Sequence, residues 1–213
     1  MPLQVRQATE EDVQAMADIA TKAFRDTVSA ILFPPHLRSL SPVDEETPWR
    51  AARTLKRMRE GIDTAVVVDT AEDGSETVIA FVQWEPPAEL KKQLGEVEEE
   101  IMPVTLDMKS VQTLLDDIDN QTREVLGPEG HSKMWYVMII AVDPNHHRRG
   151  AGKMLIRQGM QRAAAEGRSI YLSATPEGRP LYESLGFKTL AIHDVRGNPY
   201  HAMLWMPPSH CIE

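Results

Sequence analysis

The chain has 213 residues, which suits one generous domain better than two, because domains usually span about 100 to 200 residues. Its hydrophobic fraction of 42% is ordinary for a globular protein and argues against a disordered, collagen-like or coiled-coil chain. With 23 basic and 32 acidic residues, the net charge of -9 argues against general nucleic-acid binding, which requires a basic surface. A soluble folded domain is the default expectation.

Signals of export or membrane insertion are missing from the sequence. The start, MPLQVRQATEEDV, has no charged segment followed by an apolar one, so we expect no signal peptide. The longest apolar run, 134–142, is about half as long as a bilayer-spanning helix and predicts a buried strand. The single cysteine, Cys211, cannot form an internal disulfide and suits a reducing compartment. We therefore expect a cytoplasmic protein with no membrane partner.

In the first third of the chain, residues 3–8 predict a strand. Thr9 and Asp12 resemble a capping box, which predicts a helix from there to about residue 26. The segment 33–48, with four prolines, predicts a loop, and 49–60 returns to helical spacing with a basic outer face.

A hairpin and an acidic segment follow. The β-branched and aromatic runs 64–69 and 77–84 flank an Asp-Gly turn signal. Residues 85–129 then hold 12 acidic and 4 basic side chains, a net of -8, with helical stretches predicted at 88–101 and 108–126. Nearly all of the net charge of the chain therefore lies in this segment.

The last third alternates strands and helices. We expect strands at 133–142 and 170–174, helices at 149–166 and 176–185, and a closing pair of strands at 189–195 and 202–206. This order predicts an α/β fold with a mixed central sheet flanked by helices. We expect one domain over 1–213, with a helical insert at about 85–130 between the third and fourth strands.

The most informative segment lies between the strand ending at Val142 and the following helix. A Gly-x-Gly turn, Gly150-Ala151-Gly152, opens that helix, whose N-terminal amides and dipole favour an anion. Nearby basic side chains add charge at the same end, so this is a local pyrophosphate site inside an acidic protein. These are Arg148, Arg149 and Lys153.

Two other phosphate motifs do not fit this segment. A P-loop ending at Gly152-Lys153 would require glycine at 147 and serine or threonine at 154, where the chain has His147 and Met154. A dinucleotide fingerprint starting at Gly150 would require glycine or alanine at 155, where Leu155 stands. Without a ligand, the segment would be an ordinary basic helix start.

Two motifs make the chain similar to the GCN5-related N-acetyltransferases, the GNAT superfamily. The segment 147–152, HRRGAG, resembles the acetyl-coenzyme A signature of that family, with His147 in place of glutamine or arginine. The segment 181–187, LYESLGF, resembles the family helix and turn LYExxGF. Thr175 stands where many relatives carry an asparagine that contacts the coenzyme, although Thr175 with Pro176 would also cap the following helix.

The resemblance implies that acetyl-coenzyme A is the co-substrate and that no metal is needed. Backbone groups at Ile140 and Val142 would pair with the pantetheine arm, and the loop together with Thr175 would hold the coenzyme. The loop residues implied are His147, Arg148, Arg149, Gly150, Ala151, Gly152 and Lys153. An amine would attack the acetyl carbonyl directly, and Tyr182 would protonate the departing thiolate, since a phenol is protonated at neutral pH.

The proton acceptor for the amine stays open from the sequence. The position of the glutamate that histone-modifying relatives use is Tyr136 here. A water relay, Glu85, His193 and His201 are alternatives, and each side chain has an ordinary structural interpretation too. The adjacent His146 and His147 are not a metal site, because neighbouring side chains do not converge easily on one ion.

The acceptor itself is an amine of unknown identity. The carboxylates at 96–100 and 116–119 could favour a cationic amine, although solvated helix faces are the simpler interpretation. We expect an N-acetyltransferase for a primary amine, most simply a small molecule. The alternatives are a protein acetyltransferase acting on lysine or N-terminal amines, a non-catalytic acetyl-coenzyme A sensor, and an interaction protein with an acidic helical arm.

Overall fold

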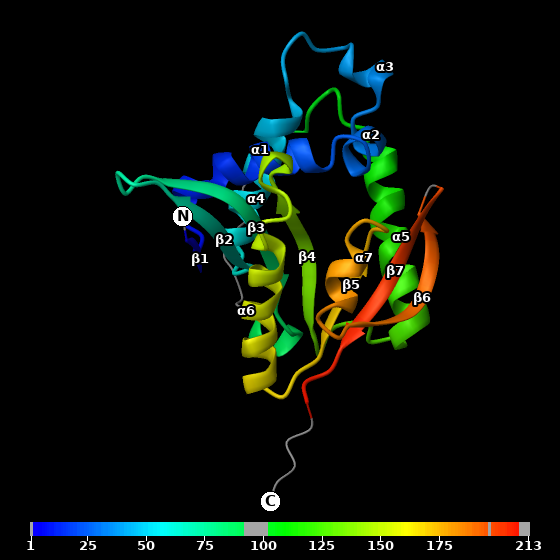
Figure 1. Ribbon diagram of the computed structural model, residues 1–213. Coiled ribbons are helices and arrows are strands. Elements are labelled where there is room, and N and C mark those ends of the chain that lie inside the picture. Colours follow the sequence, from blue (N-terminus) through cyan, green and yellow to red (C-terminus); the bar gives the residue numbers. More distant parts are fainter. Residues whose placement is uncertain (1, 92–101, 196, 209–213) are drawn as a thin grey trace, which may run out of the picture.

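The computed structural model describes residues 2–91, 102–195 and 197–208 (Figure 1). Seven strands form one mixed sheet in the order β1-β2-β3-β4-β5-β7-β6. Neighbouring strands are antiparallel except for β4 and β5. The α/β prediction is confirmed. The strands are β1 Leu3–Gln7, β2 Asp63–Thr70, β3 Glu76–Glu85, β4 Trp135–Val142, β5 Ile170–Ala174, β6 Lys188–Val195 and β7 Asn198–Trp205.

The helices cover both faces of the sheet. Helix α6 lies across β1–β4 on one face, while α1 and α4 pack together on the other (Figure 1). Within the described residues, no helix has the length and apolar character needed to cross a bilayer. The helices are α1 Val13–Ala23, α2 Val28–Leu32, α3 Pro35–Arg38, α4 Glu46–Arg59, α5 Met108–Leu126, α6 Ala151–Ala165 and α7 Arg179–Glu183.

The predicted capping box is present at the start of α1. The Thr9 amide donates to Asp12 Oδ2 at 2.8 Å, and a short 3-10 turn, Glu10–Asp12, leads into the helix. Arg6 on β1 binds both oxygens of Asp12, at 2.7 and 2.8 Å. These hydrogen bonds from Arg6, together with those from Thr9, lower the pKa of Asp12 despite its burial. The first strand and first helix are thereby locked together.

The loop predicted at 33–48 is partly wrong, because it contains helix α3 and the first turn of α4. Pro35 occupies the first position of α3, where the missing amide costs nothing. Pro48 lies in the first turn of α4, where it breaks no hydrogen bond for the same reason. Proline-rich sequence here marks helix starts as well as loop.

The described part of the segment between β3 and β4 contains two helical stretches, joined to the strands by turns and loop. A 3-10 turn, Ala88–Leu90, and α5 are observed, whereas most of the helix predicted at 88–101 lies outside the described residues. Helix α5 packs against β6 and α2. Its Val111 and Leu114 join a small core with Phe33 and Trp49. Helix α5 therefore connects the last hairpin, through β6, with the small core formed by α2 and α4.

One helix begins later than predicted. Helix α7 starts at Arg179, and not at Pro176. Thr175 Oγ1 still accepts from the Gly178 amide at 3.2 Å, and the Thr175 carbonyl accepts from the amides of Gly178 and Arg179. The threonine therefore closes a turn ahead of the helix. This turn contains residues 176–178, which were predicted to be helical.

Candidate functional site

The sheet is divided between β4 and β5. These parallel strands pair only at Trp135 with Ile170 and at Tyr136 with Tyr171, and they diverge toward the end of β4 (Figure 1). On its other edge β4 stays paired with β3 as far as Val142. From Val137 onward, the described part of the chain therefore gives β4 no strand on its β5 side. Backbone groups along this edge can pair with an extended ligand, in the manner of an added strand.

A tight loop joins the free end of β4 to α6. Arg148 and Gly150 have φ angles of 60° and 87°, so both lie in the left-handed region. Left-handed backbone is rare for arginine and concentrates at functional sites. A Cβ built on Gly150 would meet nothing within 4 Å, so the space beside the helix start is open. The loop can bring main-chain amides to an anion, as its sequence predicts.

Ion pairs and hydrogen bonds fix this loop to the rest of the sheet. Arg149 Nη1 donates to Asp69 Oδ2 on β2 at 2.6 Å, and to His146 Nδ1 at 2.9 Å. At the other end of the loop, Lys22 on α1 pairs with Asp143 at 3.2 Å. Arg149 was predicted to bind the coenzyme, but here its guanidinium is held by Asp69. Its observed contacts are therefore those of an anchor for the loop.

The remaining predicted loop residues differ in exposure. His147 is exposed, and its Nε2 lies 3.3 Å from the Val142 carbonyl. Ala151 and Gly152 are buried at the helix start, and Lys153 is half-buried. A Cβ on Gly152 would lie 3.2 Å from Leu181 and 3.7 Å from Val142, so this glycine lets α6 approach β4 closely. The contiguous motif thus combines an open turn with a packed helix start.

Tyr182 lies in the main core, on the side of the sheet that α6 covers. Its ring packs edge-on against Phe187 with centroids 5.7 Å apart, and only 5% of the residue is exposed. Burial raises the pKa of Tyr182 above that of an ordinary phenol. The hydroxyl is therefore protonated throughout the neutral range and can donate a proton but not accept one.

A second group of side chains lies where β4 and β5 begin to diverge. Glu85, Tyr136 and Tyr171 are neighbours across β3, β4 and β5. Burial alone would raise the pKa of Glu85, but hydrogen bonds with His131 and Lys91 lower it to about 2. Burial, with smaller contributions from Tyr171 and Glu85, raises the pKa of Tyr136, which therefore cannot serve as a base.

The two candidate histidines of the last hairpin lie elsewhere. His201 is buried on β7 opposite Ala174, and His193 lies on the edge strand β6, opposite Tyr200. Two strands therefore separate His193 from β4, whereas His201 is next to the end of β5. Of the bases considered from the sequence, Glu85 is next to the point of divergence, while His131 was missed. Its partner Glu85 is 46 residues away, and no local pattern links the two.

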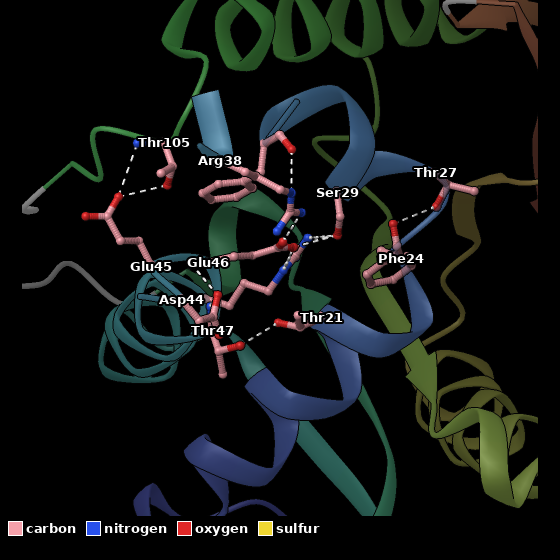
Figure 2. A network of polar contacts seen from close by, with 12 residues as sticks. Thr21, Phe24, Thr27, Ser29, Arg38, Asp44, Glu45, Glu46, Thr47 and Thr105 are labelled. Atoms are coloured by element: carbon pink, nitrogen blue, oxygen red, sulfur yellow. Dashed lines mark hydrogen bonds and ion pairs between the residues drawn. The ribbon is translucent and has the colours of Figure 1, made fainter. Parts of the chain in front are cut away.

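A buried charge cluster holds α2, α3 and α4 together (Figure 2). Glu46, which is 1% exposed, accepts from Ser29 Oγ at 2.5 Å, Arg50 Nε at 2.9 Å and Arg38 Nη2 at 2.5 Å. Arg50 Nη2 also donates to Ser29 Oγ at 2.9 Å. Nearby, Glu45 accepts from the amide and hydroxyl of Thr105, which ties the segment before α5 to α4. Helices α2, α3 and α4 are thus held together by ion pairs and hydrogen bonds as well as by apolar packing.

The described residues contain no group of three side chains suited to hold a metal ion. The two adjacent histidines of the loop contact Arg149 and the Val142 carbonyl.

Comparison with known proteins agrees with the motifs and the fold. A family model described as an acetyltransferase (GNAT) domain matches residues 117–189, which include the loop and Tyr182. Among solved structures, an N-acetyltransferase from Staphylococcus aureus has a TM-score of 0.57 at 15% identity, with 97% of this chain and 99% of that chain covered.

Two further structures are similar over nearly their whole length. The histone acetyltransferase HPA2 and related acetyltransferase of Corynebacterium glutamicum has a TM-score of 0.56 at 20% identity, with 98% of both chains covered. A GNAT phosphinothricin acetyltransferase of Sinorhizobium meliloti, solved in complex with acetyl-coenzyme A, has a TM-score of 0.57 at 15% identity, covering 97% and 89%. At these identities the likeness establishes the fold alone. The segment 117–189, which contains both the loop 147–152 and the segment 181–187, matches the acetyltransferase (GNAT) domain.

Proposed function

We propose that the protein transfers an acetyl group from acetyl-coenzyme A directly to a primary amine of a small molecule. The main support for this proposal is that β4 separates from β5 next to the start of α6, where Gly150 forms a tight turn. An extended thioester needs main-chain partners along a strand edge, and its pyrophosphate needs amides at a helix start. In this fold the two features are consecutive in the chain and adjacent in space.

The residues present fit this co-substrate. The open space at Gly150 admits an anion, and the β5-facing edge of β4, including Ile140 and Val142, offers main-chain groups. Lys153 and Arg148 add positive charge at the helix start, and Thr175 lies at the end of β5 across the divergence. The coenzyme supplies an activated acetyl group with a thiol leaving group. An acyl-enzyme is not required, so the chain need provide only binding and proton transfer.

Tyr182 is proposed as the general acid that protonates the thiolate. Its raised pKa keeps the proton on the hydroxyl at neutral pH, so the group is available as a donor when the thiolate departs. The proton transfer itself is uphill, because a free thiol titrates near pH 8.5 and a phenol near 10, so the tyrosine must regain a proton as the amide forms. Burial on the α6 side of the sheet also keeps water from the group.

Replacing Tyr182 with phenylalanine is expected to lower turnover by about 100-fold, because general acid catalysis contributes on this scale. The ring still packs against Phe187, so coenzyme affinity should change by less than about twofold. Thiol release under saturating substrates measures turnover, and calorimetry measures affinity. Equal turnover in both proteins would show that another acid, or water, protonates the thiolate.

Replacing Gly150 with asparagine is expected to weaken acetyl-coenzyme A binding by at least about 10-fold. Asparagine tolerates left-handed backbone, so the loss would come from a side chain in the anion space and not from backbone strain. Gly74 in the β2–β3 turn is a matched control, with φ of 83° and nothing within 4 Å of an added Cβ. Calorimetry should find the Gly74→Asn protein unchanged; unchanged affinity in Gly150→Asn as well would contradict the assigned loop.

A non-catalytic sensor remains the alternative function, because no base was evident from the sequence on β4. The sensor would bind acetyl-coenzyme A with the same affinity but release no thiol with any amine. A panel of small amines, lysine peptides and peptides with free N-termini separates these cases. Turnover with peptides alone would favour a protein acetyltransferase over a small-molecule enzyme.

A further inference from the structure

His131 lies just before β4 and is held there by a turn and by ring stacking. It lies in a turn closed by hydrogen bonds from the Gly130 amide to the Gly127 carbonyl and from the Met134 amide to the His131 carbonyl, at 2.9 and 2.8 Å. The imidazole stacks on the Tyr136 ring with centroids 4.3 Å apart, and lies 6.4 Å from the Tyr171 ring. These contacts place the ring beside the first residues of the divergence.

The two nitrogens of this imidazole have different surroundings. Nε2 lies 3.4 Å from Glu85 Oε2, whereas Nδ1 is buried and has no hydrogen-bond partner among the described residues. A carboxylate on one ring nitrogen fixes the tautomer with its proton there, which leaves the lone pair on the other nitrogen. The side chain as a whole is 27% exposed, but Nδ1 itself is covered, so an amine reaches this nitrogen only when the groups that cover it shift.

His131 and Tyr182 lie on opposite faces of the divided sheet. Trp135 and Val137 point into the core under α6, the same core that contains Tyr182. Because side chains alternate along a strand, Tyr136 and the His131 ring stacked on it lie on the other face. A reaction centre in the gap between β4 and β5 would therefore meet a proton donor from one face and a proton acceptor from the other.

We propose that His131 accepts a proton from the acceptor amine and that Glu85 positions it. This inference rests on the proposed acetyl transfer. An alkylammonium gives one proton to Nδ1 of His131, and the free amine forms the C–N bond as the C–S bond breaks. Tyr182 gives its proton to the thiolate and regains one from the nitrogen that has become an amide. His131 finally releases its proton to water, so the reaction yields amide, thiol and one proton.

The charged groups around the imidazole come from several elements. Glu85 on β3 is paired with Lys91 as well as His131, and its low pKa keeps it ionised at neutral pH. Tyr136 and Tyr171 face the ring as neutral phenols, since burial raises the pKa of each. Arg57 on α4 acts electrostatically on Tyr136.

The test compares His131→Phe with the unmodified protein. Phenylalanine keeps a flat ring on Tyr136 but has no nitrogen, so kcat should fall about 100-fold while coenzyme affinity and melting temperature are unchanged. The pH profile should change as well. The variant should require preformed free amine, so its rate should keep rising with pH up to the titration of the amine, without an earlier plateau. Glu85→Gln should give a smaller fall.

Chemical rescue separates a proton acceptor from a packing residue. Added imidazole should restore part of the turnover of His131→Ala, with an efficiency that follows the neutral fraction of imidazole. Full activity in His131→Phe, or a loss that imidazole does not restore, would overturn the assignment. A rescuable loss in His201→Ala instead would move the role to β7. If the unmodified protein binds acetyl-coenzyme A but acetylates no amine, the proposed function itself is wrong. That result is distinct from a failure of the His131 assignment, in which the unmodified protein is active.

Discussion

Replacing Glu46 with alanine is expected to lower the free energy of unfolding by about 3 to 5 kcal/mol, because it leaves a buried arginine without its carboxylate. The Arg50 side chain is 9% exposed, and its burial lowers the pKa of its guanidinium. Glu46 is its anionic partner at 2.9 Å, and Ser29 is its neutral one. Urea unfolding followed by circular dichroism measures the change.

Two further variants identify the cause of this loss. Asp119→Ala breaks an exposed pair with Arg123 of similar length, and should change stability by less than about 0.5 kcal/mol. The double variant Glu46→Leu with Arg50→Leu removes both charges and should recover most of the stability that the single variant loses. A Glu46→Ala protein within about 1 kcal/mol of the original would mean that water solvates Arg50.

Replacing Gly159 with alanine is expected to destabilise the protein by at least about 2 kcal/mol, although the same change in an exposed helix stabilises it by about 1 kcal/mol. A Cβ on Gly159 would lie 2.2, 2.4 and 2.7 Å from three atoms of the Trp84 indole. Trp84 is 1% exposed in the core between α6 and the sheet, so neither group can move freely. Thermal and urea unfolding report the loss.

A smaller ring at position 84 should suppress this effect. Trp84→Phe removes part of the indole, so Gly159→Ala should cost less in that background than alone, giving a favourable coupling energy. Gly152→Ala is the comparison within the same helix, because its nearest contact is the flexible end of Leu181 at 3.2 Å. Equal losses at Gly152 and Gly159 would indicate a general effect of α6 and not contact with Trp84.

The parts of this fold that were predictable depend on local pattern. Runs of β-branched, aromatic and other apolar residues located the strands. The capping box at Thr9 and the turn at Asp73-Gly74 each depend on residues only a few positions apart. The signature 147–152 also lies within one turn of chain. Each of these features carries its structural cause in adjacent residues, so a single sequence is enough to find it.

The parts that were missed depend on contacts between distant residues. Helix α3 depends partly on Arg38, which binds the Phe33 carbonyl at 2.6 Å and the carboxylate of Glu46. The attachment of Arg149 to Asp69 spans 80 residues, and the approach of His131 to Glu85 spans 46. No local propensity encodes such pairs, so the sequence located the loop but not what holds its side chains.

The early end of the pairing between β4 and β5 has a consequence for how the sequence of this protein can change in evolution. A donor that pairs with the main chain of β4 is recognised by groups that every amino acid carries, so most substitutions along that edge leave its recognition intact. The group formed by His131, Tyr136, Tyr171 and Glu85 is instead made of side chains, so each substitution there changes its shape or charge. If the donor binds as proposed, its binding would tolerate most substitutions along this edge, while the choice of acceptor would change with the side chains around it.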